Sequence, residues 1–328
     1  MKDKTKGILA GSAFAAVCAA ATASGLVTNK LVHLALDKES PIKESEKGRK
    51  ALTGNDGFDR LLESAAQAGK RLADTPHETV TIKSYDALTL TGHWFPCKDA
   101  KRVVIAMHGW RSGWANDFGM IADFLRKNQC SVLYAEQRAQ GSSEGAYMGF
   151  GMLERHDCLE WIRWVNAQGN DRTPIYLVGI SMGATTVLMT AGLDLPDNVR
   201  GIIADCGFTS AQAIWEHVAK KNLHIPYGPL RSAAVNGLCR RKLGVTSDHC
   251  STTDAMESCA VPILFIHGSD DRFVPVEMTY ENHKACAAPK RLLIVPGACH
   301  GASYLKDPES YQNAVLAFWQ DFDRAGEI

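Results

Sequence analysis

A serine placed between two glycines is the feature of this sequence that most directly indicates chemistry. Residues 175–188, IYLVGISMGATTVL, run from an apolar strand-like segment through the pattern GISMG at 179–183 into a helix-forming segment. A strand that turns sharply into a helix crowds its own backbone, and glycines on either side of the bend remove the side chains that would collide. The pattern predicts that Ser181 stands clear of the bend, where its hydroxyl could attack a carbonyl group.

A serine hydroxyl becomes a nucleophile only when a base takes its proton and a carboxylate orients that base. On a sheet that carries such a turn, these partners follow later strands in the order serine, acid, histidine. Of the eleven histidines in the chain, His300 in PGACHGASY follows the last expected strand and has glycines on both sides of its segment. His300 is therefore the predicted base.

Three aspartates are candidates for the orienting acid. The segment HGSDDRFVP follows the apolar run ILFI and offers Asp271, which we prefer, and Asp270, the alternative. Asp205, at the end of GIIAD, is a third candidate because an acid one strand earlier could still reach His300. The two aspartates that are not used would be ordinary loop or capping residues.

Attack on an ester or amide carbonyl creates an oxyanion, which two backbone N–H groups should stabilise. Met182, directly after the nucleophile, is predicted to supply one of them. Trp110, in the loop after RVVIAMHG, is predicted to supply the other. The side chains of Trp110 and Trp114 could also line the substrate pocket, or they could pack without touching substrate.

The elements that must position these residues alternate between strands and helices. Expected strands cover 79–84, 88–95, 102–109, 131–136, 175–180, 201–205, 263–268 and 291–297, the first two as a hairpin. Helical segments separate the later strands, and such repeats require a mostly parallel sheet with helices on both faces. The predicted fold class is α/β, a doubly wound sheet of about eight strands. Ligands of these sheets bind beyond the carboxyl ends of the strands, where each candidate residue falls.

Three regions are expected along the chain. Residues 1–37 form an N-terminal membrane anchor or signal segment, and residues 38–78 form a charged linker followed by an amphipathic helix. Residues 79–328 form the α/β domain, with a helical lid at about 212–259. The apolar residues of that insertion could cover a pocket or simply pack on the sheet.

The first 28 residues are read as a targeting signal. Lys2, Lys4 and Lys6 precede an uncharged stretch at 7–28 that is long enough to cross a bilayer. We prefer a retained single-pass anchor, which would place the enzyme at the cell membrane with its catalytic domain outside. A cleaved signal peptide, and hence a secreted protein, is the alternative, and a buried alanine-rich helix is a third interpretation.

Composition excludes several classes of partner. Lys+Arg and Asp+Glu both number 36, so no positive field would attract nucleic acid. The ten cysteines include no Cys-x-x-Cys pair, and the sequence predicts neither a metal nor a cofactor. A disulfide among Cys239, Cys250 and Cys259 is left open, because it depends on the redox compartment.

With these residues in place, residues 79–328 resemble the α/β-hydrolase superfamily. They are most similar to its bacterial serine-aminopeptidase-like and dienelactone-hydrolase-like branches, and to a membrane-anchored subgroup. The matching motifs are HGW at 108–110, EQRAQGSSEG at 136–145, GISMG at 179–183, HGSDDRFVP at 267–275 and GACHG at 297–301. The resemblance implies a Ser181–Asp271–His300 triad with the Trp110 and Met182 amides as oxyanion donors. Glu136, Ala139 and Gln140 depart from the pattern of the second motif, which puts substrate preference in doubt more than chemistry.

The expected function is hydrolysis of a carboxylic ester by a serine hydrolase, with a small acyl ester as substrate. A serine aminopeptidase acting on short peptides is the alternative, and Glu216, Asp248 or Asp254 would then hold the substrate's amine. A non-catalytic binding protein that keeps the fold is the second alternative. All three expectations use the same fold, so the arrangement of the site has to separate them.

Overall fold

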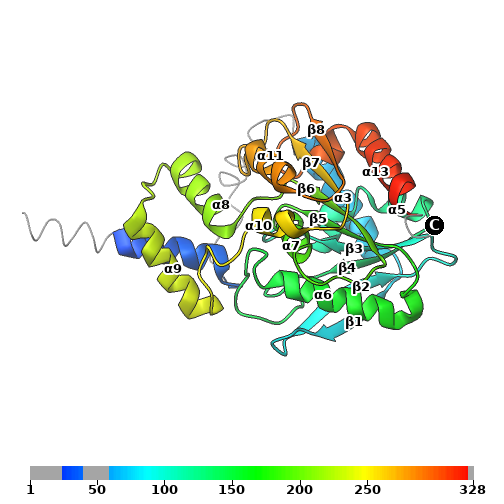
Figure 1. Ribbon diagram of the computed structural model, residues 1–328, viewed down its shortest axis with the longest axis horizontal. Helices are drawn as coiled ribbons and strands as arrows, with labels where there is room; N and C mark the ends of the chain where they lie inside the picture. Colours follow the sequence, from blue (N-terminus) through cyan, green and yellow to red (C-terminus); the bar gives the residue numbers. More distant parts are fainter. Residues whose placement is uncertain (1–23, 40–58, 324–328) are drawn as a thin grey trace, which may run out of the picture.

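The computed structural model describes residues 24–39 and 59–323, and an eight-stranded sheet runs through them (Figure 1). The strand order is β1-β2-β4-β3-β5-β6-β7-β8. The strands are β1 (Glu78–Lys83), β2 (Thr89–Phe95), β3 (Arg102–Met107), β4 (Cys130–Ala135), β5 (Ile175–Ile180), β6 (Val199–Asp205), β7 (Ile263–Gly268) and β8 (Lys290–Val295). β2 runs antiparallel to β1 and β4, and the other neighbours are parallel. The predicted mostly parallel sheet is confirmed.

The central strands are apolar throughout because helices cover both faces of the sheet. Every residue of β3, β4 and β7 is buried. A strand that is buried on one face only would alternate apolar and polar residues. The parallel register sets Met107 beside Gly179 and Ile180 beside Asp205, so the carboxyl ends of β3, β5 and β6 meet at one edge.

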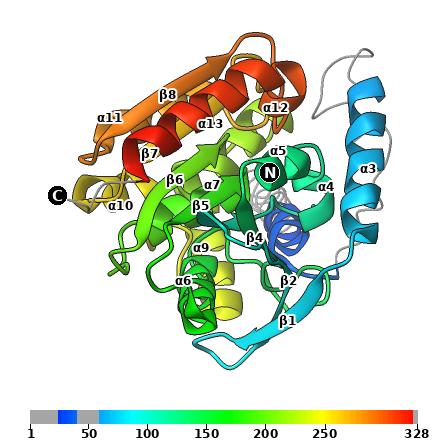
Figure 2. The same cartoon turned by 90° about the vertical axis from the view of Figure 1, so that its right-hand side faces the viewer.

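Two apolar clusters, one on each face, hold the helices to the sheet. The first contains side chains of α6 (Glu154–Val165), α7 (Met182–Thr190), α10 (Thr252–Ser258) and α11 (Val276–Ala285). The second contains side chains of α3 (Asp59–Asp74), α4 (Trp114–Phe118), α5 (Ala122–Lys127) and α13 (Pro308–Phe322). Figure 2 shows α6 and α3 well apart, with the sheet between them. Two short helical segments lie outside these clusters' main helices: η2 (Asn166–Asn170) follows α6, and α12 (Ser303–Lys306) follows the His300 loop.

The segment between β6 and β7 carries additional helices. α8 (Ala211–His217), the wider turn η3 (Val218–Asn222) and α9 (Pro229–Leu243) project from the sheet, at the left of Figure 1. They form a third apolar cluster with Met182 and Phe208, which lie at the carboxyl edge. α10, at the end of the same segment, packs on the sheet through the fully buried Met256. The part that stands over the carboxyl edge is therefore α8 to α9.

The N-terminal segment requires a correction. Residues 24–36 form a helix that lies beside α9, shown blue in Figure 1. Val32 and Leu36 are 4% and 0% exposed in the third cluster, so its apolar face contacts protein. Among residues 24–39 and 59–323, the structure contains no helix with the length and apolar character needed to cross a membrane. The predicted single-pass anchor, and the localisation built on it, is wrong on this finding; residues 1–23 of that segment lie outside the described residues.

The cysteines of the described residues are all free thiols. Cys239 and Cys259 are buried and Cys250 is half-buried, and none of the three is in a disulfide. The disulfide that the sequence left open is therefore absent from this part of the chain.

Candidate active site

Ser181 occupies a strained turn between β5 and α7. Its φ and ψ are 56° and −117°, a conformation that non-glycine residues rarely adopt. A Cβ added to Gly179 would lie 2.2 Å from the Gly183 carbonyl oxygen, and one added to Gly183 would lie 1.8 Å from that of Met107. Both glycines are thus required by close backbone contacts, as the sequence pattern indicates.

We expect Gly183→Ala to lower the free energy of unfolding by about 3 kcal/mol or more, because β3 must move to admit the methyl group. The matched control is Gly237→Ala in the middle of α9, where an added Cβ meets nothing within 4 Å. This control should stabilise the protein by about 0.5–1 kcal/mol through helix propensity. Urea unfolding of both variants measures the difference, and equal stability of Gly183→Ala and the unchanged protein would contradict the steric argument.

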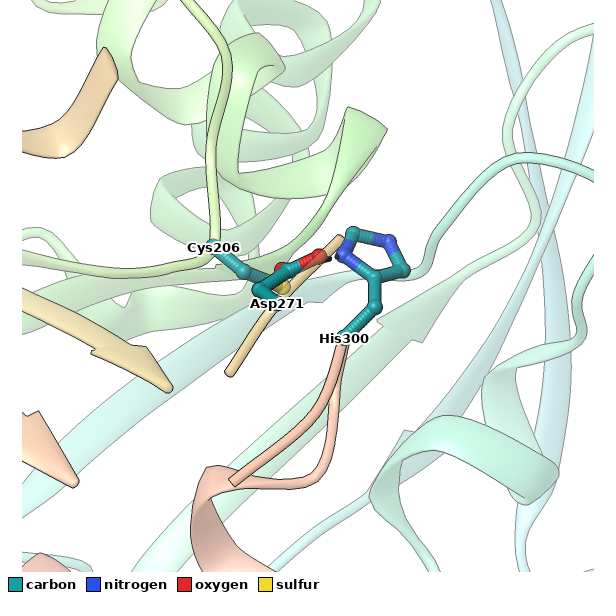
Figure 3. A group of neighbouring side chains, drawn as sticks. All are labelled: Cys206, Asp271 and His300. Atoms are coloured by element: carbon teal, nitrogen blue, oxygen red, sulfur yellow. Dashed lines mark hydrogen bonds and ion pairs between the residues drawn. The ribbon is translucent and has the colours of Figure 1, made fainter. Parts of the chain in front are cut away.

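Ser181, His300 and Asp271 form a continuous chain of hydrogen-bonding groups. Ser181 Oγ lies 2.9 Å from His300 Nε2, and His300 Nδ1 lies 2.7 Å from Asp271 Oδ2. Figure 3 shows the His300 ring and the Asp271 carboxylate directed toward each other from separate loops. These loops follow β5, β7 and β8, so the parallel register is what brings the three predicted residues together.

The Asp271 carboxylate is held in place by several donors. Its Oδ1 accepts hydrogen bonds from the backbone N–H groups of Phe273 and Val274, both at 2.9 Å. Burial acts to raise the pKa of Asp271, but the charge of His300 and hydrogen bonds from His267 and His300 hold it well below its usual range. Asp271 is therefore an anion at neutral pH. The sequence reasoning missed His267, although it stands in the same HGSDD motif.

His300 has the reverse balance. Burial acts to lower the pKa of His300, but the Asp271 charge, helped by the nearby Cys206, raises it well above 6.5. The ring of Phe273 packs edge-on against His300, with centroids 5.0 Å apart, and limits its movement. The imidazole is thus oriented on both sides and faces the Ser181 hydroxyl.

The two alternative acids bind elsewhere. Asp270 is exposed, and its Oδ1 accepts from the Ser269 hydroxyl at 2.7 Å. Asp205 is buried and accepts from the Ser303 hydroxyl at 2.9 Å, while burial raises its pKa to about 6. Neither is the hydrogen-bonding partner of His300.

The loop after β3 presents an unused backbone donor near the nucleophile. Gly109 N–H binds Asp117 Oδ2 at 2.7 Å, and Arg111 N–H binds Gln140 Oε1 at 2.7 Å. Between them, the N–H of Trp110 has no acceptor among the described residues, and neither has that of Met182. The side chain of Trp114, by contrast, packs in the second apolar cluster and is stacked on His93, with ring centroids 4.0 Å apart.

The arrangement matches known proteins in both sequence and fold. Residues 102–241 match a family model described as alpha/beta hydrolase fold. The structure resembles that of the Pyrococcus furiosus esterase Pf2001 with a TM-score of 0.61, at 23% identity over 77% of this chain and 95% of that one. The chain has the alpha/beta hydrolase fold. The hydrolase fold is also that of Est1E from Butyrivibrio proteoclasticus, solved with ferulic acid (TM-score 0.58, 18% identity, 74% and 98% covered).

A relative found by sequence extends over most of this chain. The uncharacterized protein YqkD of Bacillus subtilis (strain 168) is 26% identical over 246 residues, which are 75% of this chain and 80% of that protein. The shared part is long enough to contain the whole sheet.

Cys206 is a neighbour of the candidate site that the sequence did not predict. Its sulfur lies with ligand atoms of Asp271 and His300 in a group whose members are all within 4.8 Å of one another (Figure 3). Three such atoms could hold a metal ion. However, burial raises the pKa of the Cys206 thiol to about 11, and metals bind the thiolate. The hydrogen bond between Asp271 and His300 also occupies the two other ligand atoms, so this geometry favours hydrogen bonding over metal binding.

The loop that carries Glu136, Ala139 and Gln140 lies beside the candidate site and is held by a buried ion pair of Arg138. Arg138 is buried and binds Asp157 through two hydrogen bonds of 2.6 Å. The Glu136 carboxylate accepts a hydrogen bond from His93 Nε2 at 3.0 Å. Gln140 contacts the loop of Trp110 through its hydrogen bond with the Arg111 N–H.

Proposed function

We propose that the chain is a serine hydrolase that cleaves carboxylic esters. Ser181 is the nucleophile, His300 the general base and acid, and Asp271 the residue that orients and charges the imidazole. The single observation that carries this proposal is the chain of contacts from Ser181 Oγ through His300 to Asp271, at 2.9 Å and 2.7 Å. A serine at a strained elbow with an oriented imidazole at its hydroxyl is the arrangement that acyl transfer requires.

The proposed reaction has two halves. Ser181 Oγ attacks the ester carbonyl while its proton moves to His300 Nε2, and the resulting oxyanion accepts hydrogen bonds from the N–H groups of Trp110 and Met182. His300 then protonates the departing alcohol, leaving an acyl-enzyme. Water, deprotonated by His300, attacks this ester, and Ser181 regains its proton as the carboxylic acid leaves.

An apolar substrate is favoured by the residues over the carboxyl edge. Phe150 lies 6.2 Å from Trp110, 5.9 Å from Phe208 and 4.9 Å from Trp215, measured between ring centroids. We propose that α8 and α9 are a lid and that these rings contact the acyl or aryl part of the ester. The fold neighbour Pf2001, an esterase, and Est1E, solved with ferulic acid, are consistent with this substrate class.

The peptidase alternative gains no support from the carboxylates that it would need. Glu216 is paired with Lys220 on the exposed side of α8, and Asp248 accepts from the Asn236 amide. Asp254 is exposed on α10, which packs on the sheet rather than over the site. None of these three is left to bind a substrate amine near Ser181.

A p-nitrophenyl ester series from acetyl to octanoyl, assayed beside aminoacyl-anilides, tests the substrate class. We expect ester turnover to exceed anilide turnover by at least a hundredfold, since none of the three candidate carboxylates, Glu216, Asp248 and Asp254, is placed to bind the α-amine. The reverse preference would contradict the ester assignment.

Labelling with a fluorophosphonate probe tests the reaction class independently of the substrate. We expect the unchanged protein to react and the Ser181→Ala variant not to react. Absence of labelling in the unchanged protein, together with no turnover of any ester, would favour a non-catalytic protein on a hydrolase fold.

A further inference from the structure

The N-terminal helix, residues 24–36, ends against the loop that carries Trp110. The indole Nε1 of Trp110 donates to the Ala35 carbonyl at 2.8 Å. One guanidinium nitrogen of Arg111 donates to the carbonyls of Leu34 at 2.9 Å and Asp37 at 2.5 Å. Two consecutive residues of the loop therefore bind three carbonyls at the end of one helix, some 75 residues away in the chain.

These contacts suit the chemistry of a helix end. The last carbonyls of a helix have no partner within it, and they form the negative end of the helix dipole, which attracts a cation. The helix is itself anchored on that side, since Lys242 of α9 binds both carboxylate oxygens of Asp37 at 2.8 Å and 2.9 Å. The carbonyls that accept hydrogen bonds from Arg111 are thus held in place by the contact between Asp37 and Lys242.

Arg111 has a backbone conformation that needs such support. Its φ is 52°, in the left-handed region where a side chain is unfavourable. The Gln140 amide oxygen binds the Arg111 N–H at 2.7 Å, and the guanidinium lies 5.2 Å from the centre of the Trp110 ring. A strained backbone conformation is kept where surrounding contacts hold it in place. The contacts that hold Arg111 therefore also hold the adjacent Trp110, whose N–H has no acceptor among the described residues.

We propose that the end of this helix, acting through the side chains of Arg111 and Trp110, positions the Trp110 N–H as an oxyanion donor. This inference rests on the proposed ester hydrolysis. An oxyanion donor must be placed within a few tenths of an ångström, and its loss affects the transition state more than substrate binding. Arg111 and the Trp110 indole are therefore positioning groups, and their removal should lower kcat with little change in KM.

The test uses four variants of the full chain. Arg111→Ala removes the contacts to Leu34 and Asp37, Arg111→Lys keeps a cation that can reach one carbonyl, and Trp110→Phe keeps the backbone N–H while removing the indole donor. Arg231→Ala is the matched control. Arg231 binds Ser24 and Thr28 at the other end of the same helix, so this variant loosens the helix away from the loop.

We expect Arg111→Ala to lower kcat about tenfold or more and Trp110→Phe about threefold or more, each with KM within twofold. Arg111→Lys should recover part of the loss, and Arg231→Ala should keep kcat within twofold. A boronic acid, which forms a tetrahedral adduct on serine, should bind more weakly in proportion to the loss of kcat, because its oxygen occupies the same site. Circular dichroism at the assay temperature confirms that each variant is folded.

Two results would overturn the inference alone. One is normal fluorophosphonate labelling with kcat and boronate affinity unchanged in both Arg111→Ala and Trp110→Phe, even if their melting temperatures fall. The other is a loss in Arg231→Ala as large as that in Arg111→Ala. If Arg111→Ala does not fold, Trp110→Phe and Arg111→Lys decide between these outcomes. Failure of the unchanged protein to label would instead overturn the proposed function, and this inference with it.

Discussion

Replacing Ser181 by alanine is expected to lower kcat/KM for p-nitrophenyl esters by about four orders of magnitude, and replacing His300 by alanine should cost a similar factor. Without the hydroxyl there is no atom to form the acyl-enzyme, and without the imidazole the hydroxyl keeps its proton. The 2.9 Å contact between Ser181 Oγ and His300 Nε2 implies that each group works only with the other. The double variant should therefore be hardly slower than either single variant.

Steady-state kinetics on purified protein measures this, with Ser269→Ala as the matched control. Ser269 lies at the same edge of the sheet, where its hydroxyl binds Asp270 and the Gly297 N–H. We expect this control to keep kcat within about threefold. Retention of more than a tenth of the rate in Ser181→Ala or His300→Ala would contradict the assignment, as would losses that simply multiply in the double variant.

Much of the fold could be predicted because buried parallel strands leave a direct signal in the sequence. After Arg102 the run RVVIAM is entirely apolar, and IYLVGI contains no charged residue; they form the fully or almost fully buried strands β3 and β5. The GISMG pattern then identified a turn where close backbone contacts leave no room for a side chain at either glycine. Since each later strand in a parallel sheet ends at the same edge, the order of the motifs was sufficient to expect Ser181, Asp271 and His300 together.

The prediction of an N-terminal membrane anchor failed because an apolar segment indicates burial away from water but does not tell lipid from the protein interior. Val32 and Leu36 are as well removed from water in the third cluster, which also contains Phe150 and Met182, as they would be in lipid. Only the tertiary structure distinguishes burial in lipid from burial in protein. The ion pair between Asp37, directly after the helix, and Lys242 of α9 shows that this helix packs on protein.

Contacts between loops that are distant in the chain could not be predicted from the sequence either. Cys206 reaches the Asp271–His300 pair because β6 lies between β5 and β7, and no local pattern marks that cysteine among ten. Trp114 is only four residues from Trp110, yet it packs in the second cluster, on one face of the sheet, whereas Trp110 packs against the third cluster, because α4 begins at Trp114. Side-chain direction at such a point depends on one helical turn, which composition does not determine.

Replacing Asp271 by asparagine should both slow the reaction and move its pH dependence. We expect kcat to fall by about 10³–10⁴, because the amide cannot stabilise the imidazolium that forms as His300 takes the proton. In the unchanged protein Asp271 raises the pKa of His300 well above 6.5, against the effect of burial. The reaction needs neutral His300, so activity is present above this pKa and is lost as the pH falls through it. The acid limb of the kcat/KM profile should therefore lie above pH 6.5.

In Asp271→Asn the charge is gone while the burial remains, so the pKa of His300 should fall below that of the unchanged protein and the acid limb should move to lower pH. Asp270→Asn is the matched control, because this neighbouring carboxylate is exposed and accepts its hydrogen bond from Ser269, not from His300. It should leave both the rate and the acid limb in place. A shift in the control equal to that in Asp271→Asn would assign the orienting role to Asp270. If the acid limb stays fixed in both variants, the titrating group is not an imidazole paired with Asp271. Removing a charge 2.7 Å from such an imidazole must change its pKa.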